Sequence, residues 1–374
     1  MNKQRCFAKI NVDNLINNFS VVKALCPDCR IMPVIKADAY THGAVQVAKA
    51  LGDRADIFAV AEIEEAKQLR ASGIDKEILI LGYTDPLCAK ELVRENFTQT
   101  VMSLEYANAL FENLNGEKLK IHIKIDTGMH RFGFDSENEN TVEEIREISE
   151  NPSFVIDGMF THFSKSDNLA SDFTSIQQTR FEKIIDALLE KGIKIPYLHS
   201  ANSAGILAHK FPRMNMVRPG IILYGAYPSD DVKAKHLSNH PNMPLKEVMT
   251  VGARVGQIKT IKKGDGIGYS LTHTFKDDAV VAIVSAGYAD GISRALSNKG
   301  EATINGIRFS IVGTVCMDLL MLDITGYEDK VRVGDEVLFW GEGSIPVDEY
   351  AKLCDTISYT VYTGISKRVV RIYE

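Results

Sequence analysis

The sequence predicts an α/β protein in which a (β/α)8 TIM-type barrel is followed by a mostly β domain. Three observations support this prediction. Short apolar runs alternate with amphipathic segments through the first two-thirds of the chain, this rhythm changes after about Pro241, and 374 residues are enough for two domains. We place the barrel at residues 8–235 and the β domain at residues 245–374, with the linker within residues 228–245.

Eight apolar runs have the length and spacing of buried parallel strands. Between them lie helix-like segments, of which residues 174–191 carry Phe181, Ile184 and Leu188 on one stripe. Eight strand–helix alternations are typical of a barrel; a doubly wound open sheet is the alternative, although no G-x-G-x-x-G follows any run. The runs are residues 31–36, 57–61, 77–82, 98–103, 121–126, 154–160, 195–200 and 216–225, and the other helical segments include 43–51, 62–71 and 103–114.

The last third of the chain reads as strands and tight turns. Asn305-Gly306 lies between two strand-like runs and predicts a hairpin turn. The N-terminal segment CFAKINV is a further strand, which pairs either with this β domain or with the barrel; the sequence leaves both open. The strand-like runs are residues 248–261, 279–285, 302–315, 319–324 and 330–340.

Composition excludes several classes of function. Hydrophobic residues make up 45% and charged residues 25%, and no apolar stretch reaches the roughly 18 residues of a membrane span. With a net charge of -6 and scattered basic residues, we expect neither a nucleic-acid nor a membrane partner. The N-terminus has no signal-peptide pattern, so we expect a cytoplasmic protein, either a free enzyme or the cytoplasmic domain of a membrane-anchored one. Cys26 and Cys29 form a lone C-x-x-C with no second ligand pair, so we expect reduced loop cysteines and no metal site.

Polar and ionisable side chains follow the ends of six of the eight predicted strands. In a barrel these carboxyl ends surround the active site. Lys36 ends the apolar run MPVIK, where a lysine is costly unless it is used. Gly220, Ile221 and Ser203 can offer backbone N–H groups and a hydroxyl to a phosphate. A lysine facing a phosphate-bearing cofactor suggests a Schiff base with pyridoxal 5′-phosphate (PLP).

Several segments carry a resemblance to a known family. The stretches VIKADAYTHGA, KIDTGMHRFGF, GMFTHF, HSANSAG, NMVRPGIILYG, GIGYS, GYADG and VGTVCMD occur in order between about Ala8 and Tyr373. Together they resemble the motifs of the alanine racemase family. The resemblance implies a PLP-binding barrel, a β domain, and a homodimer with active sites at the subunit interface. It also implies interconversion of L- and D-alanine, which supplies D-alanine for bacterial peptidoglycan.

The resemblance also implies roles for individual residues. Lys36 would hold PLP and act as one base, and Tyr269 would be the second base, reaching in from the partner subunit. Arg218 would face the pyridine nitrogen, and His162 would lie beside the ring and hydrogen-bond into the Arg218 network. The remaining implied roles are cofactor binding for Tyr40, Leu81, Asn202, Ser203, Gly220, Ile221 and Tyr359, substrate binding for Arg131, Met317 and Tyr288, and carbamylation for Lys124, which would then steady Arg131.

These residue types suit the chemistry. Racemisation removes the α-proton from one face and returns it on the other, so two bases on opposite faces suffice. Lysine and tyrosine have ordinary pKa values of about 10.4 and about 10, which a cationic site can lower. An arginine at the pyridine nitrogen keeps its own proton, so the ring stays neutral and is a weaker electron sink.

Three alternatives and two departures from the family pattern bear on this interpretation. A PLP-dependent decarboxylase would place a carboxylate where Arg218 stands, and a PLP homeostasis protein would be a single barrel. Thr41 replaces a usual glycine, and Thr314 replaces an arginine near the entryway formed with Asp167 and Arg294. Losing that arginine predicts a wider entrance and a substrate range extended to serine, as in a serine/alanine racemase domain. Tyr359 favours alanine.

Overall fold

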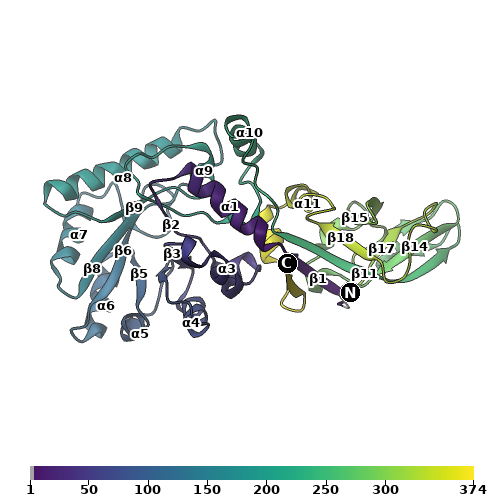
Figure 1. The fold of residues 1–374 in the computed structure, drawn as a ribbon, viewed down its shortest axis with the longest axis horizontal. Helices are drawn as coiled ribbons and strands as arrows, with labels where there is room; N and C mark the ends of the chain where they lie inside the picture. Colours follow the sequence, from purple (N-terminus) through teal and green to yellow (C-terminus); the bar gives the residue numbers. More distant parts are fainter. Residues whose placement is uncertain (1–3) are drawn as a thin grey trace.

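The computed structural model describes residues 4–374 as an elongated molecule with a barrel at one end and a β domain at the other (Figure 1). Strand β1 (Cys6–Ile10) lies in the β domain, and helix α1 (Val12–Leu25) follows it toward the barrel. The chain ends beside its start, because β19 (Val370–Tyr373) pairs in parallel with β1. Within these described residues no helix is long and apolar enough to cross a membrane.

The barrel contains the eight predicted parallel strands. Six follow one another in one sheet, and β10 pairs with β2. Backbone bonds join the two sheets: Val34 bridges to Ala59, and the N–H of Asn215 donates to the Leu198 carbonyl at 3.1 Å. The strands are β2 (Arg30–Ile31), β3 (Ile57–Val60), β4 (Glu77–Ile80), β5 (Phe97–Val101), β6 (Leu119–Asp126), β8 (Phe154–Phe160), β9 (Tyr197–His199) and β10 (Met216–Val217).

The first and last barrel strands are shorter than predicted. Runs 31–36 and 216–225 contain only two strand residues each, β2 and β10, before other conformations begin. Pro33 and Pro219 lack the N–H that a regular ladder requires, which accounts for the early ends. Residues 221–224 form a 3-10 turn instead of a strand.

Helices pack around the barrel, and the four helical segments named from the sequence all form. Ser103 caps its helix by accepting a hydrogen bond from the Tyr106 N–H at 3.1 Å. The predicted linker holds α10 (Asp230–Asn239), capped in the same way by Ser229. The other helices are α3 (Ala44–Leu51), α4 (Ile63–Ala71), α5 (Ala89–Arg94), α6 (Leu104–Leu114), α7 (Thr141–Glu150), α8 (Phe173–Glu190) and α9 (Ser203–Ala208).

The β domain is built around the long strand β11 (Met249–Ile261), which pairs with β1, β14 and β18. The N-terminal strand therefore belongs to this domain. The run 302–315 folds back at Asn305 and Gly306, whose φ values of 51° and 79° fit the predicted hairpin. The other strands are β12 (Gly266–Ile267), β13 (His273–Thr274), β14 (Ala279–Val284), β15 (Glu301–Ile304), β16 (Ile307–Ser310), β17 (Leu320–Asp323) and β18 (Glu336–Trp340).

The end of the chain returns to the barrel. Helix α11 (Val347–Leu353) leads to α12 (Ser358–Thr363), where the hydroxyl of Tyr362 donates to the Tyr224 carbonyl at 3.0 Å. The hydroxyl of Thr41 donates to the Tyr362 carbonyl at 2.6 Å. These contacts bring α12, which carries Tyr359, to the edge of the barrel mouth.

Candidate active site

A cavity of about 500 Å³ opens at the carboxyl ends of the barrel strands. Twelve residues selected from the sequence line it, although they come from strands, helices and loops spread over more than 300 positions. Phe160 and Phe132 add apolar surface to the same cavity. The twelve are Lys36, Tyr40, Leu81, Lys124, Arg131, His162, Asn202, Ser203, Arg218, Gly220, Ile221 and Tyr359.

Lys36 lies where the chain leaves the barrel wall, and the residues after it form a left-handed turn. Residues 37–41 all have positive φ, from 53° to 64°, in a region that costs ordinary L-residues roughly 1–2 kcal/mol each. Glu65 supports the turn, since its two oxygens accept the N–H groups of Ala37 at 2.6 Å and Ala61 at 2.7 Å. Burial, and next the nearby Arg131 charge, lower the pKa of Lys36, which favours the neutral amine.

The departure at Thr41 has a structural compensation. Its φ is 64°, a conformation that favours the glycine usual in the family. The Thr41 hydroxyl bond to the Tyr362 carbonyl and a 3.0 Å bond from Nε of Arg371 to the Thr41 carbonyl hold the residue there. The turn after Lys36 is thereby tied to the C-terminal segment.

Gly220, Ser203 and Tyr40 form a small polar cradle on one wall of the cavity. The N–H of Gly220 donates to Oγ of Ser203 at 3.0 Å. A Cβ at position 220 would lie 2.8 Å from the Tyr40 hydroxyl and 3.8 Å from the Ser203 hydroxyl. Only glycine leaves the space beside these two hydroxyls empty. The Tyr40 and Ser203 hydroxyls therefore face a space that a phosphate group could occupy.

Arg218 is 4% exposed and is held by four hydrogen bonds. Nη1 donates to Nδ1 of His199 at 2.7 Å and to the His199 carbonyl at 3.0 Å, and Nη2 donates to the carbonyls of Thr161 at 2.7 Å and Ser200 at 3.1 Å. The guanidinium lies 5.1 Å from the centre of the Phe160 ring. Burial lowers the pKa of Arg218 to about 9, so the group remains charged at neutral pH.

The imidazole that contacts Arg218 is His199, whereas the sequence resemblance had implied His162. Strand β9 ends at His199 and points its ring at Arg218 inside the barrel wall. His162 lines the cavity itself. Burial, and next the Arg218 charge, hold the pKa of His162 well below its usual value, so its ring is neutral.

The loop after β6 places Arg131 at the cavity edge. Asp126, the last residue of β6, fixes the loop because its carboxylate accepts hydrogen bonds from four backbone N–H groups, an arrangement typical of Asx turns. Lys124 lies inside, 7% exposed, and donates to the Ile125 carbonyl at 2.8 Å. Burial, and next the Arg218 charge, lower the pKa of Lys124 to about 7. The four N–H donors to Asp126 belong to Gly128, Met129, His130 and Arg131.

The predicted second base and two of the predicted substrate-binding residues lie on the β domain, outside this cavity. Tyr269 is 70% exposed, Met317 52% and Tyr288 43%. Two backbone bonds of 3.0 Å join their loops, from Tyr288 N–H to the Cys316 carbonyl and from Ala289 N–H to the Met317 carbonyl. The structure thus brings Tyr288 and Met317 together on an exposed surface.

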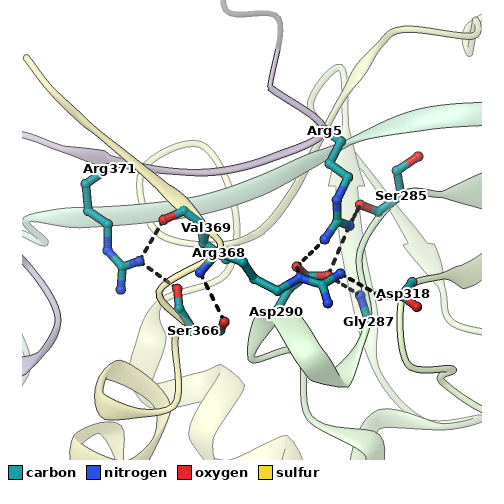
Figure 2. A network of polar contacts seen from close by, with 9 residues as sticks. All are labelled: Arg5, Ser285, Gly287, Asp290, Asp318, Ser366, Arg368, Val369 and Arg371. Atoms are coloured by element: carbon teal, nitrogen blue, oxygen red, sulfur yellow. Dashed lines mark hydrogen bonds and ion pairs between the residues drawn. The ribbon is translucent and has the colours of Figure 1, made fainter.

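A buried carboxylate fixes these loops (Figure 2). Asp290 is 0% exposed and accepts the Gly287 N–H at 3.0 Å. It also binds Arg5 at 2.6 Å and Arg368 at 2.9 Å, and Arg368 continues to Asp318 at 2.5 Å. Residues from both ends of the chain therefore hold the GYADG loop and the loop of Met317 in register.

The three entryway residues do not form one wall in a single chain. Asp167 lies beside Tyr359 in a second cavity of about 440 Å³. Arg294 is exposed at the start of a 3-10 turn on the β domain. Thr314 is only 7% exposed, beneath the segment that carries Tyr269.

The sequence analysis assigned no role to His122 or to Gly158, which lie behind the cavity. His122 contacts His199, with Nδ1 of His122 2.9 Å from Nε2 of His199. Gly158 makes room for the His122 ring, since a Cβ there would lie 2.4 Å from it. The alternation in IHIKID signals an inward His122, but nothing local signals its partner.

The six cysteines are free, and Cys26 and Cys29 lie just before β2, at the barrel end opposite the cavity. The Cys29 N–H donates to the Cys26 carbonyl at 3.2 Å in a turn. Among residues 4–374, no group of three or more histidine, cysteine, aspartate or glutamate side chains is arranged to hold a metal ion.

Comparisons with known proteins agree over the whole chain. The family model for the alanine racemase N-terminal domain matches residues 10–228, and that for the C-terminal domain matches residues 248–373. A protein named alanine racemase from Carboxydothermus hydrogenoformans is 42% identical, over 98% of this chain and 99% of its own. One from Methanococcus maripaludis is 39% identical over 98% of both chains.

Solved structures show the same arrangement. An alanine racemase of Clostridium difficile 630 matches with a TM-score of 0.93 at 41% identity, covering 100% of this chain and 97% of that chain. An alanine racemase of Bacillus anthracis, solved with bound L-Ala-P, matches with a TM-score of 0.90 at 31% identity, covering 100% and 96%.

Proposed function

The chain belongs to the alanine racemase family, and from that premise we propose which of its residues carry out the reaction. The family uses PLP to interconvert L- and D-alanine, and this enzyme is an isomerase of that kind, which supplies D-alanine for peptidoglycan. Lys36 and Tyr269 act as the two bases, on opposite faces of the α-carbon. Arg218 sets the electronic character of the cofactor ring.

The cavity residues fit PLP. The hydroxyls of Tyr40 and Ser203 and the backbone at Gly220 and Ile221 would receive its phosphate, and Lys36 would hold it covalently. Bound PLP supplies an electron sink for the pair left when the α-proton departs. Arg218 would face the pyridine nitrogen as a donor only, which keeps that nitrogen unprotonated and limits side reactions.

The two bases need a second copy of the chain. Lys36 lines the cavity, while Tyr269 stands 70% exposed on the β domain, outside the cavity of its own subunit. Other large apolar side chains of the β domain are exposed as well, including Leu271 at 62% and Leu319 at 44%. A homodimer that covers this surface would present Tyr269, Tyr288 and Met317 to the partner's Lys36. This separation of the two bases is the observation that carries the proposal.

A mixing experiment tests both the bases and the dimer. Lys36→Ala and Tyr269→Ala subunits are each expected to be inactive as homodimers. Mixed and reassembled, they should recover about a quarter of the native activity, since about half the dimers are mixed and each has one complete site. Lys120→Ala serves as the control, because Lys120 is a partly exposed lysine of β6 outside the cavity. Failure of the mixture to exceed either variant alone contradicts the shared site.

Borohydride reduction of the PLP-loaded enzyme tests the cofactor lysine separately. Mass spectrometry should find the reduced cofactor on the peptide that contains Lys36. In heavy water the enzyme should exchange the α-proton of alanine without releasing carbon dioxide. Carbon dioxide release would instead favour a decarboxylase.

A further inference from the structure

The neighbours of Tyr269 in sequence have positive φ, a conformation that non-glycine residues seldom adopt. Gly268, Ser270 and Leu271 have φ values of 72°, 59° and 48°, so left-handed residues flank the tyrosine on both sides. Because its side chain is 70% exposed, packing within its own subunit does little to place the phenol. Whatever fixes the backbone of this segment therefore fixes the tyrosine.

A chain of side-chain hydrogen bonds ends on the Tyr269 carbonyl. Oγ1 of Thr314 lies 3.2 Å from that carbonyl and 3.2 Å from Oγ1 of Thr272, which in turn accepts from Nδ2 of Asn298 at 3.1 Å. The Thr314 hydroxyl has one proton, which it donates to the carbonyl, so the Thr272 hydroxyl must donate to Thr314. Oδ1 of Asn298 accepts the Gly313 N–H at 2.6 Å, which fixes the amide orientation.

Glycines bring the two segments close enough for these bonds. A Cβ at Gly313 would lie 2.9 Å from the Ile267 carbonyl oxygen, and a Cβ at Gly268 would lie 3.4 Å from the Thr314 nitrogen. Thr314 is thus packed between the two segments at 7% exposure. A long charged side chain here would have to leave this space, so threonine suits the site by size as well as by its hydroxyl.

We infer that Thr314 is a positioning residue that holds Tyr269 through its carbonyl, with Thr272 and Asn298 orienting the Thr314 hydroxyl. The inference rests on the proposed function, in which Tyr269 is a base. Without the Thr314 hydroxyl the left-handed segment loses a partner, and the phenol samples positions from which proton transfer is slower.

The test measures α-proton exchange of each alanine enantiomer in heavy water, with the configuration retained, using the PLP-loaded enzyme. Tyr269→Phe should abolish exchange of the enantiomer that Tyr269 serves and spare the other. Thr314→Val, which removes only the hydroxyl, should slow exchange of the same enantiomer by about three- to tenfold. Thr314→Ser should restore it, and Thr272→Val should show the same asymmetry more weakly.

Thr303→Val is the matched control, because Thr303 is a buried threonine of the β domain whose hydroxyl pairs with Ser344 at 2.9 Å. It should leave both rates unchanged. Equal losses for both enantiomers in Thr314→Val, or no loss, overturn the positioning role while leaving the two-base proposal intact. No asymmetry in Tyr269→Phe overturns both. If Thr314→Val does not fold, the decision rests on Thr272→Val and Thr314→Ser.

Discussion

Nη1 of Arg218 lies 2.7 Å from Nδ1 of His199, and this bond fixes the proton positions of two buried histidines. Arginine only donates, so Nδ1 of His199 accepts and its proton sits on Nε2. That proton points to Nδ1 of His122 at 2.9 Å, which leaves the His122 proton on Nε2, 3.9 Å from Asp157. A directed series of polar groups therefore runs from Arg218 to Asp157, behind the cavity wall.

Replacing His199 by leucine should destabilise the fold and loosen Arg218. An N–H of a buried guanidinium would lose its partner, which typically costs about 1–3 kcal/mol. His199→Asn should recover part of this loss, because its amide oxygen can accept from Arg218. Urea unfolding compares the free energies of unfolding, and PLP titration measures the affinity. Equal stability of the leucine variant and the native enzyme would contradict the prediction.

Lys124 should take up carbon dioxide. Its pKa of about 7 leaves much of the amine neutral near pH 7.5, and a neutral amine adds carbon dioxide to give a carbamate and a proton. The carbamate would replace a cation beside Arg218 and Arg131 with an anion. With ¹³C-bicarbonate, NMR should show a carbamate signal at pH 8 that fades toward pH 5.5. Lys124→Met is the control, and the same signal in that variant would place the carbamate elsewhere.

The free energy of unfolding should fall as the pH rises from about 5 to about 7. Burial raises the pKa of Glu247 from 4.5 to about 7, and its carboxyl accepts the Val347 N–H at 2.6 Å. In this window the folded state keeps a proton that the unfolded chain has released, so stability is lost with rising pH, on the order of 1–3 kcal/mol, and levels off above pH 7. Glu247→Gln should flatten this part of the profile.

Urea unfolding at pH 5.0, 6.0 and 7.5 measures this slope. Glu112→Gln, at an exposed helix position, should leave it unchanged. An identical slope in Glu247→Gln and the native enzyme would assign the pH dependence to other groups.

Asp290→Asn should destabilise the β domain and impair the surface that carries Tyr288 and Met317. The change leaves Arg5 and Arg368, which are about two-fifths exposed, facing one another without the carboxylate (Figure 2). Because solvent screens both arginines, we expect a loss of about 1–3 kcal/mol, below the roughly 3–5 kcal/mol of a fully buried pair. Differential scanning calorimetry measures the effect. Asp318→Asn, in the exposed arm of the network, should change stability by less than about 1 kcal/mol.

The sequence by itself determined the order of the domains, the eight barrel strands and twelve of the residues that line the cavity. Apolar runs indicate local burial, and the carboxyl ends of barrel strands meet at one end of the barrel. The sequence alone therefore placed Lys36 and Arg218 in the same site. The family motifs added Tyr359 to the same cavity. Where strand order alone sets a residue's surroundings, the periodicity of the sequence is sufficient to place that residue in the site.

Only the tertiary structure decided which side chains contact one another across the barrel and between the domains. The partner of Arg218 is His199, at the end of β9, and a contact between side chains of two different strands leaves no trace in local periodicity. The burial of Thr314 under Tyr269, and the pairing of β1 with β11 and β19, are contacts between segments far apart in sequence. Their energies depend on distances that long-range packing sets, and a pattern of neighbouring residues does not contain those distances.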